Sequence, residues 1–171
     1  MPTDNSKTLD ALQTAIRMEI DGKEFYLKAG EASTNEIGSK LFKTLAKEED
    51  GHRALFEKIY KSLQSKNNWP DVTPAPADNE LKTLFAKAVL KVKPSSSEIE
   101  AVHKAMEMEN KTRDFYQANA KEAQFDVEKE YYVKLAGIEA VHHKTLLDYY
   151  EYLKNPVDYF TLKEHHSLDG G

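Results

Sequence analysis

The chain has 171 residues, of which 40% are hydrophobic and 31% charged, and its formal net charge is −5. This length and composition suit one domain with a sizeable core, and the negative charge argues against nucleic acid or an anionic membrane as the main partner. The absence of cysteine excludes disulfides, thiolate metal sites and iron–sulfur clusters. Residues 1–10 are polar and no segment is apolar enough to span a bilayer. We therefore expect a cytoplasmic protein.

Four segments carry apolar residues at helical spacing, and they fall into two pairs. The first pair is predicted at about residues 8–32 and 36–65, and the second at about 97–122 and 126–154. In each segment the apolar positions recur every three, four or seven residues, which places them on one face of a helix. Because only a few residues separate the helices of a pair, each pair is expected to form an antiparallel hairpin.

The connection between the pairs, residues 66–96, is much longer. Pro70, Pro74 and Pro76 predict a loop in its first part, and residues 80–91 a short helix whose apolar side includes Leu90. Two hairpins joined by one long crossover have the connectivity of ferritin-like bundles. We therefore expect an all-α fold, a ferritin-like four-helix bundle that occupies residues 1–171 as a single domain.

Several residues predict where the second pair of helices begins and ends. Ser97 with Glu100 fits a capping box for the third helix, and Asp126 a cap for the fourth. Pro156 is expected to end the fourth helix, because proline cannot continue a helix. Residues 155–171 are then expected to form an irregular tail, and three apolar residues in it are candidates for docking on the bundle or on a partner: Tyr159, Phe160 and Leu162.

The two halves match each other at an offset of ninety residues. Phe25-Tyr26 corresponds to Phe115-Tyr116, and Leu45-Ala46 to Leu135-Ala136, with no gap in either half. An internal repeat of this kind is among the strongest signals that a sequence carries. It indicates a duplicated helical hairpin.

Each half also contains a Glu-x-x-His pair with another glutamate thirty residues before it. The two triplets are Glu19, Glu49 and His52, and Glu109, Glu139 and His142. A glutamate and a histidine three residues apart lie on one helix face. The two glutamates of a triplet are each fifteen residues from the turn between them, which puts both at one level, about 22 Å from that turn.

Four carboxylates and two imidazoles at one level are close to the ligand set that holds two metal ions in a helical bundle. Their oxygen and nitrogen donors suit iron or manganese. The glutamates interrupt apolar stripes, and burying carboxylates without partners is very costly. The sequence therefore predicts a dinuclear metal site.

Other polar residues near these motifs allow two interpretations. Tyr26 and Tyr116 either hydrogen-bond a ligand carboxylate or are ordinary core tyrosines. Gly22 and Thr112 either leave room for oxygen or peroxide or reflect close helix packing. The remaining candidates are expected to be solvated or to pack, not to bind metal: Glu48, Glu107, His103, His143, His165, His166, Met18 and Met108.

These motifs, over about residues 8–154, resemble the rubrerythrin branch of the ferritin-like diiron-carboxylate proteins. The resemblance implies that Glu49 and Glu139 bridge or share two irons. It also implies that Glu19 and Glu109 are terminal or chelating ligands, and that His52 and His142 each cap one iron. Two departures stand out. Rubrerythrins carry a further glutamate where this chain has Thr112, and they often carry a cysteine-ligated iron module.

The resemblance implies a non-haem diiron oxidoreductase, of peroxidase or ferroxidase/oxidase type, that reacts with hydrogen peroxide or oxygen in oxidative stress or iron oxidation. Two irons are the expected cofactors, with manganese or zinc as alternatives. A rubredoxin-like protein is expected to donate electrons, and a homodimer or higher homo-oligomer is expected. One competing hypothesis is ferritin-like iron sequestration without small-molecule turnover, which requires a large hollow oligomer. Another is a structural or interaction module whose site holds zinc or no metal.

Overall fold

The computed structural model describes residues 5–87 and 93–168, and the side chains of residues 5–85 and 93–162. Within these ranges every regular element is a helix, so the prediction of an all-α fold is confirmed. The bundle consists of four long helices, α1 (Ser6–Ala32), α2 (Glu36–Lys66), α4 (Ser96–Glu122) and α5 (Asp126–Lys154). These bounds lie within two residues of the predicted ones.

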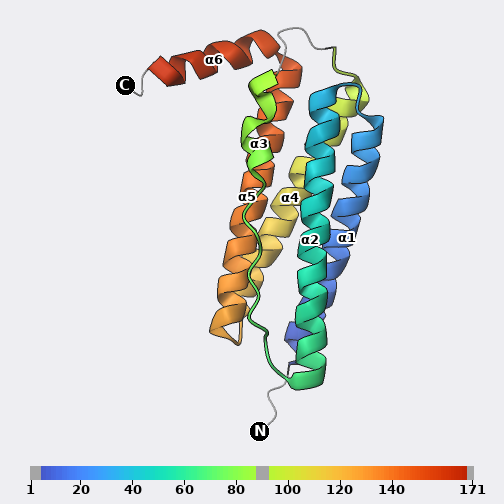
Figure 1. Cartoon of the computed structure of the whole chain (residues 1–171), viewed down its shortest axis with the longest axis vertical. Helices are drawn as coiled ribbons and strands as arrows, with labels where there is room; N and C mark the ends of the chain where they lie inside the picture. The colour runs from blue at the N-terminus through green and yellow to red at the C-terminus, as the bar shows by residue number, and fades with distance from the viewer. Residues whose placement is uncertain (1–4, 88–92, 169–171) are drawn as a thin grey trace.

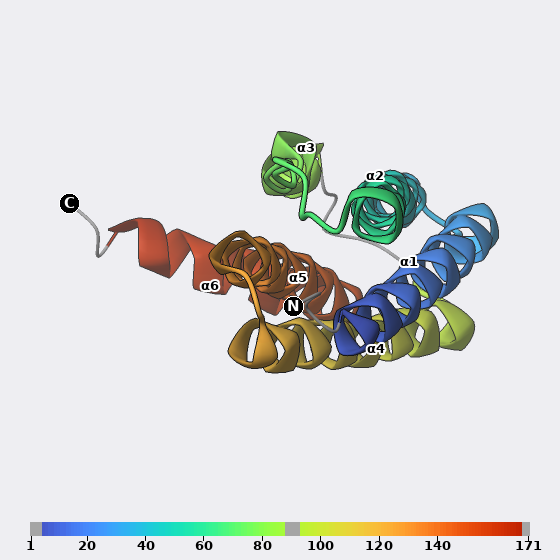
Figure 2. The same ribbon diagram turned by 90° about the horizontal axis from the view of Figure 1, so that it is seen from below.

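The four helices form two antiparallel hairpins that pack side by side (Figure 1). Helix α1 lies against α4, and the chain returns from the end of α2 along the side of the bundle formed by α2 and α5 (Figures 1 and 2). This connectivity is that of a ferritin-like bundle with one long crossover. None of the helices in residues 5–87 and 93–168 is both long and apolar enough to cross a membrane.

The crossover contains a helix where one was predicted. Helix α3 covers Asn79–Thr83 and continues as a 3₁₀ helix, η1, over Leu84–Lys87. The predicted remainder, which includes Leu90, lies outside the described residues. Trp69, Leu81 and Leu84 are buried, so the crossover packs against the bundle at these positions. Its proline-rich part has no helix, as expected.

The apolar core is divided into two clusters by the level of the Glu-x-x-His motifs. Leu45 and Leu146 belong to one cluster, and Phe56 and Leu135 to the other. In both α2 and α5 the Glu-x-x-His pair falls between these two apolar positions. The bundle therefore holds its six conspicuous polar residues mid-length, between two blocks of packed side chains.

Two predicted helix caps are wrong by one or two residues. Ser95, not Ser97, caps α4, because its hydroxyl accepts a 3.2 Å hydrogen bond from the Glu98 backbone N–H. Asp126 is the first residue of α5 instead of its cap. The Glu128 carboxylate accepts the Gln124 N–H at 2.9 Å instead. A run of serines or acidic residues offers several equivalent caps, so local sequence leaves the position open.

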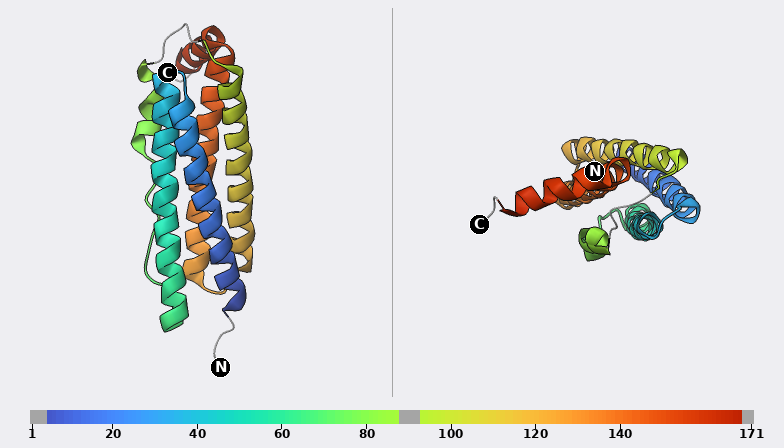
Figure 3. Two further views of the ribbon diagram at one scale, coloured as in Figure 1. Left: turned by 90° about the vertical axis from the view of Figure 1, so that its right-hand side faces the viewer. Right: turned by 90° about the horizontal axis from the view of Figure 1, so that it is seen from above.

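The prediction of an irregular tail is also wrong. Pro156 does end α5, but it also begins α6 (Pro156–Leu168), which projects away from the bundle (Figure 3). Proline is favoured at the first position of a helix, where its missing N–H has no partner to lose. The Asn155 side chain accepts the Asp158 N–H at 3.3 Å and so caps the new helix. Tyr159 docks on the bundle and Phe160 partly packs there, but Leu162 is 60% exposed.

Candidate metal centre

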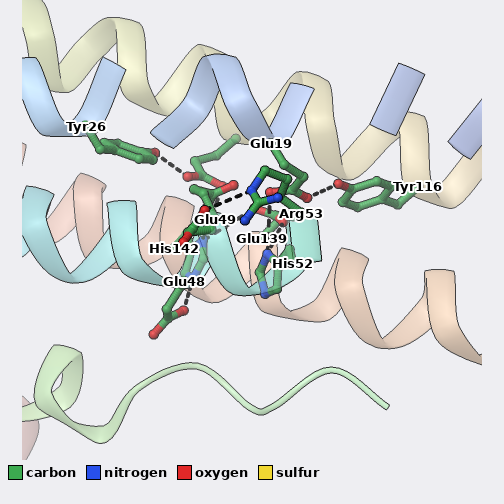
Figure 4. A network of polar contacts seen from close by, with 11 residues as sticks. Glu19, Tyr26, Glu48, Glu49, His52, Arg53, Tyr116, Glu139 and His142 are labelled. Atoms are coloured by element: carbon green, nitrogen blue, oxygen red, sulfur yellow. Dashed lines mark hydrogen bonds and ion pairs between the residues drawn. The ribbon is translucent and has the colours of Figure 1, made fainter. Parts of the chain in front are cut away.

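The six residues predicted as metal ligands come together in the middle of the bundle. Each of the four long helices contributes to this group, and all six side chains are buried. Figure 4 shows Glu19, Glu49, His52, Glu139 and His142 close together between the helices. Glu19 comes from α1 and Glu109 from α4, while α2 and α5 each supply a Glu-x-x-His pair. The duplicated hairpin thus converges on one point from both halves.

The six side chains form two overlapping groups, each able to hold one metal ion. Glu19 and His52 belong to one group, and Glu109 and His142 to the other, while Glu49 and Glu139 belong to both. Within a group, one donor atom from each residue lies within 4.8 Å of every other. Two cation positions that share two carboxylates are the arrangement of a dinuclear centre.

The distances around the imidazoles follow the same division. The Nδ1 atom of His52 lies 3.6 Å from Glu19 Oε2 and 3.7 Å from Glu139 Oε1. The Nδ1 atom of His142 lies 3.6 Å from Glu109 Oε2 and 3.4 Å from Glu139 Oε2. The two oxygens of Glu139 therefore face different histidines, as expected of a carboxylate that serves two ions.

The donor atoms of the centre are buried polar atoms without hydrogen-bond partners, and they fit a metal site. Orphaned polar atoms of this kind are rare and costly inside a protein, whereas cations between them would satisfy all of them at once. Seven such atoms converge here: Glu19 Oε2, Glu49 Oε1, His52 Nδ1, Glu109 Oε2, both Oε atoms of Glu139, and His142 Nδ1.

Burial and mutual repulsion control the charge of the centre. Burial raises the pKa of Glu19, and burial together with neighbouring carboxylates raises the pKa of Glu49 and Glu139 well above the usual range. Burial lowers the pKa of His52. For His142 burial acts in the same direction, but nearby carboxylates outweigh it and raise its pKa well above the usual range. Metal binding to these groups must therefore release protons.

Two tyrosines connect the ligand carboxylates of opposite hairpins. The Tyr26 hydroxyl, on α1, donates to Glu109 Oε1 on α4, and the Tyr116 hydroxyl, on α4, donates to Glu19 Oε1 on α1 (Figure 4). The interpretation of both tyrosines as hydrogen-bond partners of a candidate carboxylate is confirmed. These bonds fix the orientation of the two carboxylates and leave the second oxygen of each for a cation.

Comparison with known proteins agrees with this geometry. A family model for rubrerythrin matches residues 10–150. The chain belongs to the rubrerythrin family. Searches of curated proteins and of solved structures found no match. Rubrerythrin membership supports a diiron-carboxylate protein, and the buried carboxylates and histidines fit its metal site.

One residue beside the rubrerythrin centre was wrongly predicted to be solvated. The Glu48 side chain is only 13% exposed, and its Oε2 atom accepts a hydrogen bond from His142 Nε2. Its Oε1 atom accepts the backbone N–H of Asp78, in the crossover, at 2.5 Å. No local pattern could have indicated this role, because His142 lies ninety-four residues away in the sequence.

The other candidates behave as packing or surface residues. A Cβ at Gly22 would lie 3.4 Å from Glu49 Oε2, which is ordinary van der Waals contact, so packing alone does not require a glycine here. His103 is 59% exposed and pairs with Glu107. His143, Met18 and Met108 are half-buried, and neither cation group contains them. Thr112, where rubrerythrins carry a further glutamate, is also half-buried. His165 and His166 lie outside the described side chains.

Proposed function

We propose that this rubrerythrin-family protein is a non-haem diiron oxidoreductase that reacts with hydrogen peroxide or oxygen. The observation that carries the proposal is the pair of overlapping cation groups that share Glu49 and Glu139. Shared carboxylates keep two ions close enough to act on one small oxidant. The oxygen and nitrogen donors, with no sulfur, favour iron, and manganese or zinc is the alternative metal.

Each residue of the centre has a role that its contacts support. Glu19 and His52 would hold one ion and Glu109 and His142 the other, with Glu49 and Glu139 serving both. When bound, the iron pair would supply the electrons that reduce the oxidant. The carboxylates balance the charge of the ions, the tyrosine hydroxyls hold Glu19 and Glu109 in place, and the two apolar clusters limit access of water.

The cellular setting that we propose follows from family membership. Peroxide reduction would protect against oxidative stress in the cytoplasm, and reaction with oxygen would oxidise ferrous iron. Electrons would come from a separate rubredoxin-like protein, and the chain would work as a homodimer or a higher homo-oligomer. Because Thr112 replaces a glutamate of other rubrerythrins, both oxidants have to be compared directly.

The test is to load the protein with ferrous iron under anaerobic conditions and then mix it with peroxide or with oxygen. We expect two irons per chain, a rapid near-ultraviolet band, and oxidation faster than that of free ferrous ion. The faster oxidant would identify the peroxidase or the oxidase type. Iron loading should be lost in the double variant Glu49→Ala with His142→Ala and kept in Glu107→Ala, since Glu107 is 70% exposed. Loading that survives the double substitution would refute the proposed site.

The same sample separates turnover from storage. A chain that retains far more than two irons inside a large hollow oligomer would support ferritin-like sequestration. A small oligomer that holds two irons per chain would support turnover. Gel filtration with iron analysis of the protein peak measures both quantities.

A further inference from the structure

The repeat that builds the metal centre is broken at one position next to it. Glu48 precedes the Glu-x-x-His pair of α2, and the equivalent residue ninety positions later, on α5, is Ile138. The Glu48 carboxylate reaches across the bundle to His142. Ile138 is buried in an apolar cluster and has no polar atom to offer His52. The two histidines therefore differ in their outer contacts, although their inner contacts are alike.

His142 is held from both sides of its ring. Its Nδ1 atom faces Glu49, Glu109 and Glu139 at 3.4–3.6 Å. Its Nε2 atom faces the Glu48 carboxylate, and the ring is fully buried. A carboxylate can accept a hydrogen bond only if Nε2 carries a proton, so the proton that metal binding releases is the one on Nδ1, and its loss leaves a lone pair directed at the cation group. The same bond increases the basicity of the ring.

Glu48 is itself anchored by the crossover. Its Oε1 atom accepts the Asp78 backbone N–H, and the Asp78 side chain in turn accepts the Glu80 N–H at 2.9 Å as the cap of α3. Figure 4 shows the crossover running beneath Glu48 and His52. The backbone N–H of Asp78 and the imidazole N–H of His142 bind different oxygens of this carboxylate. The carboxylate therefore cannot rotate away from His142 without losing both hydrogen bonds.

His52 lacks this support. Its Nδ1 atom faces Glu19 and Glu139, and its ring borders a pocket of about 280 Å³ between α2 and the crossover, whose walls include Gly51 and Pro76. Among the described residues, none forms a hydrogen bond with His52 Nε2. The Nε2 edge of this ring therefore has no carboxylate to hold its proton and borders a pocket that water can enter.

We propose that Glu48 is a positioning residue for His142 and makes the two metal positions unequal, the His142 position binding more tightly than the His52 position. The inference rests on the proposed dinuclear site. An outer carboxylate of this kind contributes about 10- to 100-fold to metal affinity, and the centre has one on one side only.

The test is a titration of the metal-free full-length protein with Co²⁺ in competition with a chromophoric chelator. For the wild type we expect two binding steps whose dissociation constants differ by at least about tenfold. Glu48→Gln retains the length and an acceptor but loses the charge, and it should weaken the tighter step by about tenfold. Glu48→Ala loses both, and it should weaken that step by about 100-fold. The weaker step should keep its affinity in both variants.

Glu107→Gln is the matched control, because it removes the same charge from an exposed position two residues before a ligand. Its two steps should match those of the wild type. If two ions bind but the Glu48 variants behave like the control, the inference fails and the proposed site stands. An equal loss in both steps would also overturn the inference, because it would indicate a general effect on the fold. If the wild type binds no Co²⁺, the proposed site itself fails.

A measurement on the wild type alone avoids any doubt about variant folding. In the Zn²⁺-loaded protein labelled with ¹⁵N histidine, we expect the Nε2–H of His142 to exchange slowly with water and that of His52 to exchange fast. Equal exchange at the two rings would contradict the asymmetry. Loss of the slow signal in Glu48→Ala would tie it to Glu48.

Discussion

Tyr26 and Tyr116, unlike two other buried tyrosines nearby, have a carboxylate to bind. Tyr26 and Tyr116 each donate to a glutamate of the other hairpin, whereas the buried hydroxyls of Tyr131 and Tyr132 have no partner among the described residues. Burial raises the pKa of Tyr116 well above its usual range, so its hydroxyl keeps the proton that it donates. Comparing these tyrosines therefore distinguishes the contribution of the hydroxyl hydrogen bond from that of aromatic packing.

Substitution of Tyr116 by phenylalanine should destabilise the metal-free protein by about 1–3 kcal/mol, because Glu19 Oε1 would then be buried without a donor. Tyr132→Phe is the matched control. It removes a hydroxyl that makes no hydrogen bond, and its effect should be close to zero or slightly stabilising. Urea unfolding of the two variants measures both values. Equal losses would mean that the bond to Glu19 contributes nothing beyond packing.

At this scale the sequence predicted the ligand candidates but only some of the residues that hydrogen-bond them. Glu19, Glu49 and His52 were found because their spacing is repeated ninety residues later. Tyr26 was found as one of two alternatives, because its register on the helix is local information. Glu48 was missed because its partner His142 is set by how the two hairpins pack. Contacts between distant segments leave no periodic signal in either segment.

At the scale of whole elements, one carboxylate fastens the turn between α1 and α2 to the second hairpin. Glu98, in the first turn of α4, accepts hydrogen bonds from the hydroxyls of Thr34 and Tyr149 at 2.8 and 2.7 Å. Ser33 and Asn35 donate to the same carboxylate. Burial raises the pKa of Glu98, but these donors outweigh it and leave the pKa below the usual value. The ionised form is therefore the one that stabilises the fold.

The sign of the pH dependence follows from this lowered pKa. A carboxyl whose pKa is lower in the folded than in the unfolded state stabilises the protein above the unfolded pKa, and this contribution is lost as the pH falls through the folded pKa. Glu98→Gln should therefore cost about 1–3 kcal/mol at pH 7, and the difference from the wild type should shrink toward zero below about pH 4. Chemical unfolding across this range measures it. Glu100→Gln, an exposed change two residues later, should show no such trend.

Gly38 packs directly against the hydrogen bonds of Glu98, where only a residue without a side chain fits. A Cβ at Gly38 would overlap the Tyr149 hydroxyl, the Glu98 carboxylate and the Ser33 hydroxyl. Gly38→Ala should therefore lower the thermal midpoint, although alanine is the better helix former by about 1 kcal/mol. Gly137→Ala should raise it, since a Cβ there meets nothing within 4 Å. A rise in both variants would show that the turn rearranges freely.

The long helices could be predicted from sequence, because a 3.6-residue period over seven or eight turns is hard to mistake. Their ends were harder. Pro156 was interpreted only as a stop, yet the Asn155 cap and Asp158 in the first turn also indicate the start of α6. Its first turn docks through Tyr159, whose ring lies 5.5 Å from that of Phe85. That contact depends on the crossover, which the periodicity of the tail could not indicate.

On the scale of the whole molecule, the candidate metal centre is a layer of polar side chains that separates the two clusters of the apolar core. The duplicated hairpin and the long crossover predicted the bundle, because both are features of the chain as a whole. The sequence does not indicate how the contributions of the two hairpins to the centre differ. The crossover anchors Glu48 on one side only, so two similar halves form an asymmetric centre.

This arrangement predicts opposite effects of one substitution with and without metal. Glu139 is almost fully buried and faces both histidines. In the metal-free protein Glu139→Leu should raise the free energy of unfolding, by about 1–3 kcal/mol, since it removes two buried oxygens that have no hydrogen-bond partner. The wild type should gain about 2.7 kcal/mol for each site at which Co²⁺ is present at 100 times the dissociation constant of that site, and the variant should lose that gain.

Thermal and chemical unfolding with Co²⁺ or with a chelator measure the two effects on one sample. Glu107→Leu, at an exposed position on α4, should leave both the metal-free stability and the gain from Co²⁺ close to those of the wild type. If Glu139→Leu destabilises the metal-free protein, the carboxylate has a structural role of its own. If the variant keeps the full gain from Co²⁺, Glu139 does not serve the two cation positions. If the variant is more stable than the wild type without metal and gains nothing from Co²⁺, then Glu139 serves metal binding and destabilises the metal-free fold.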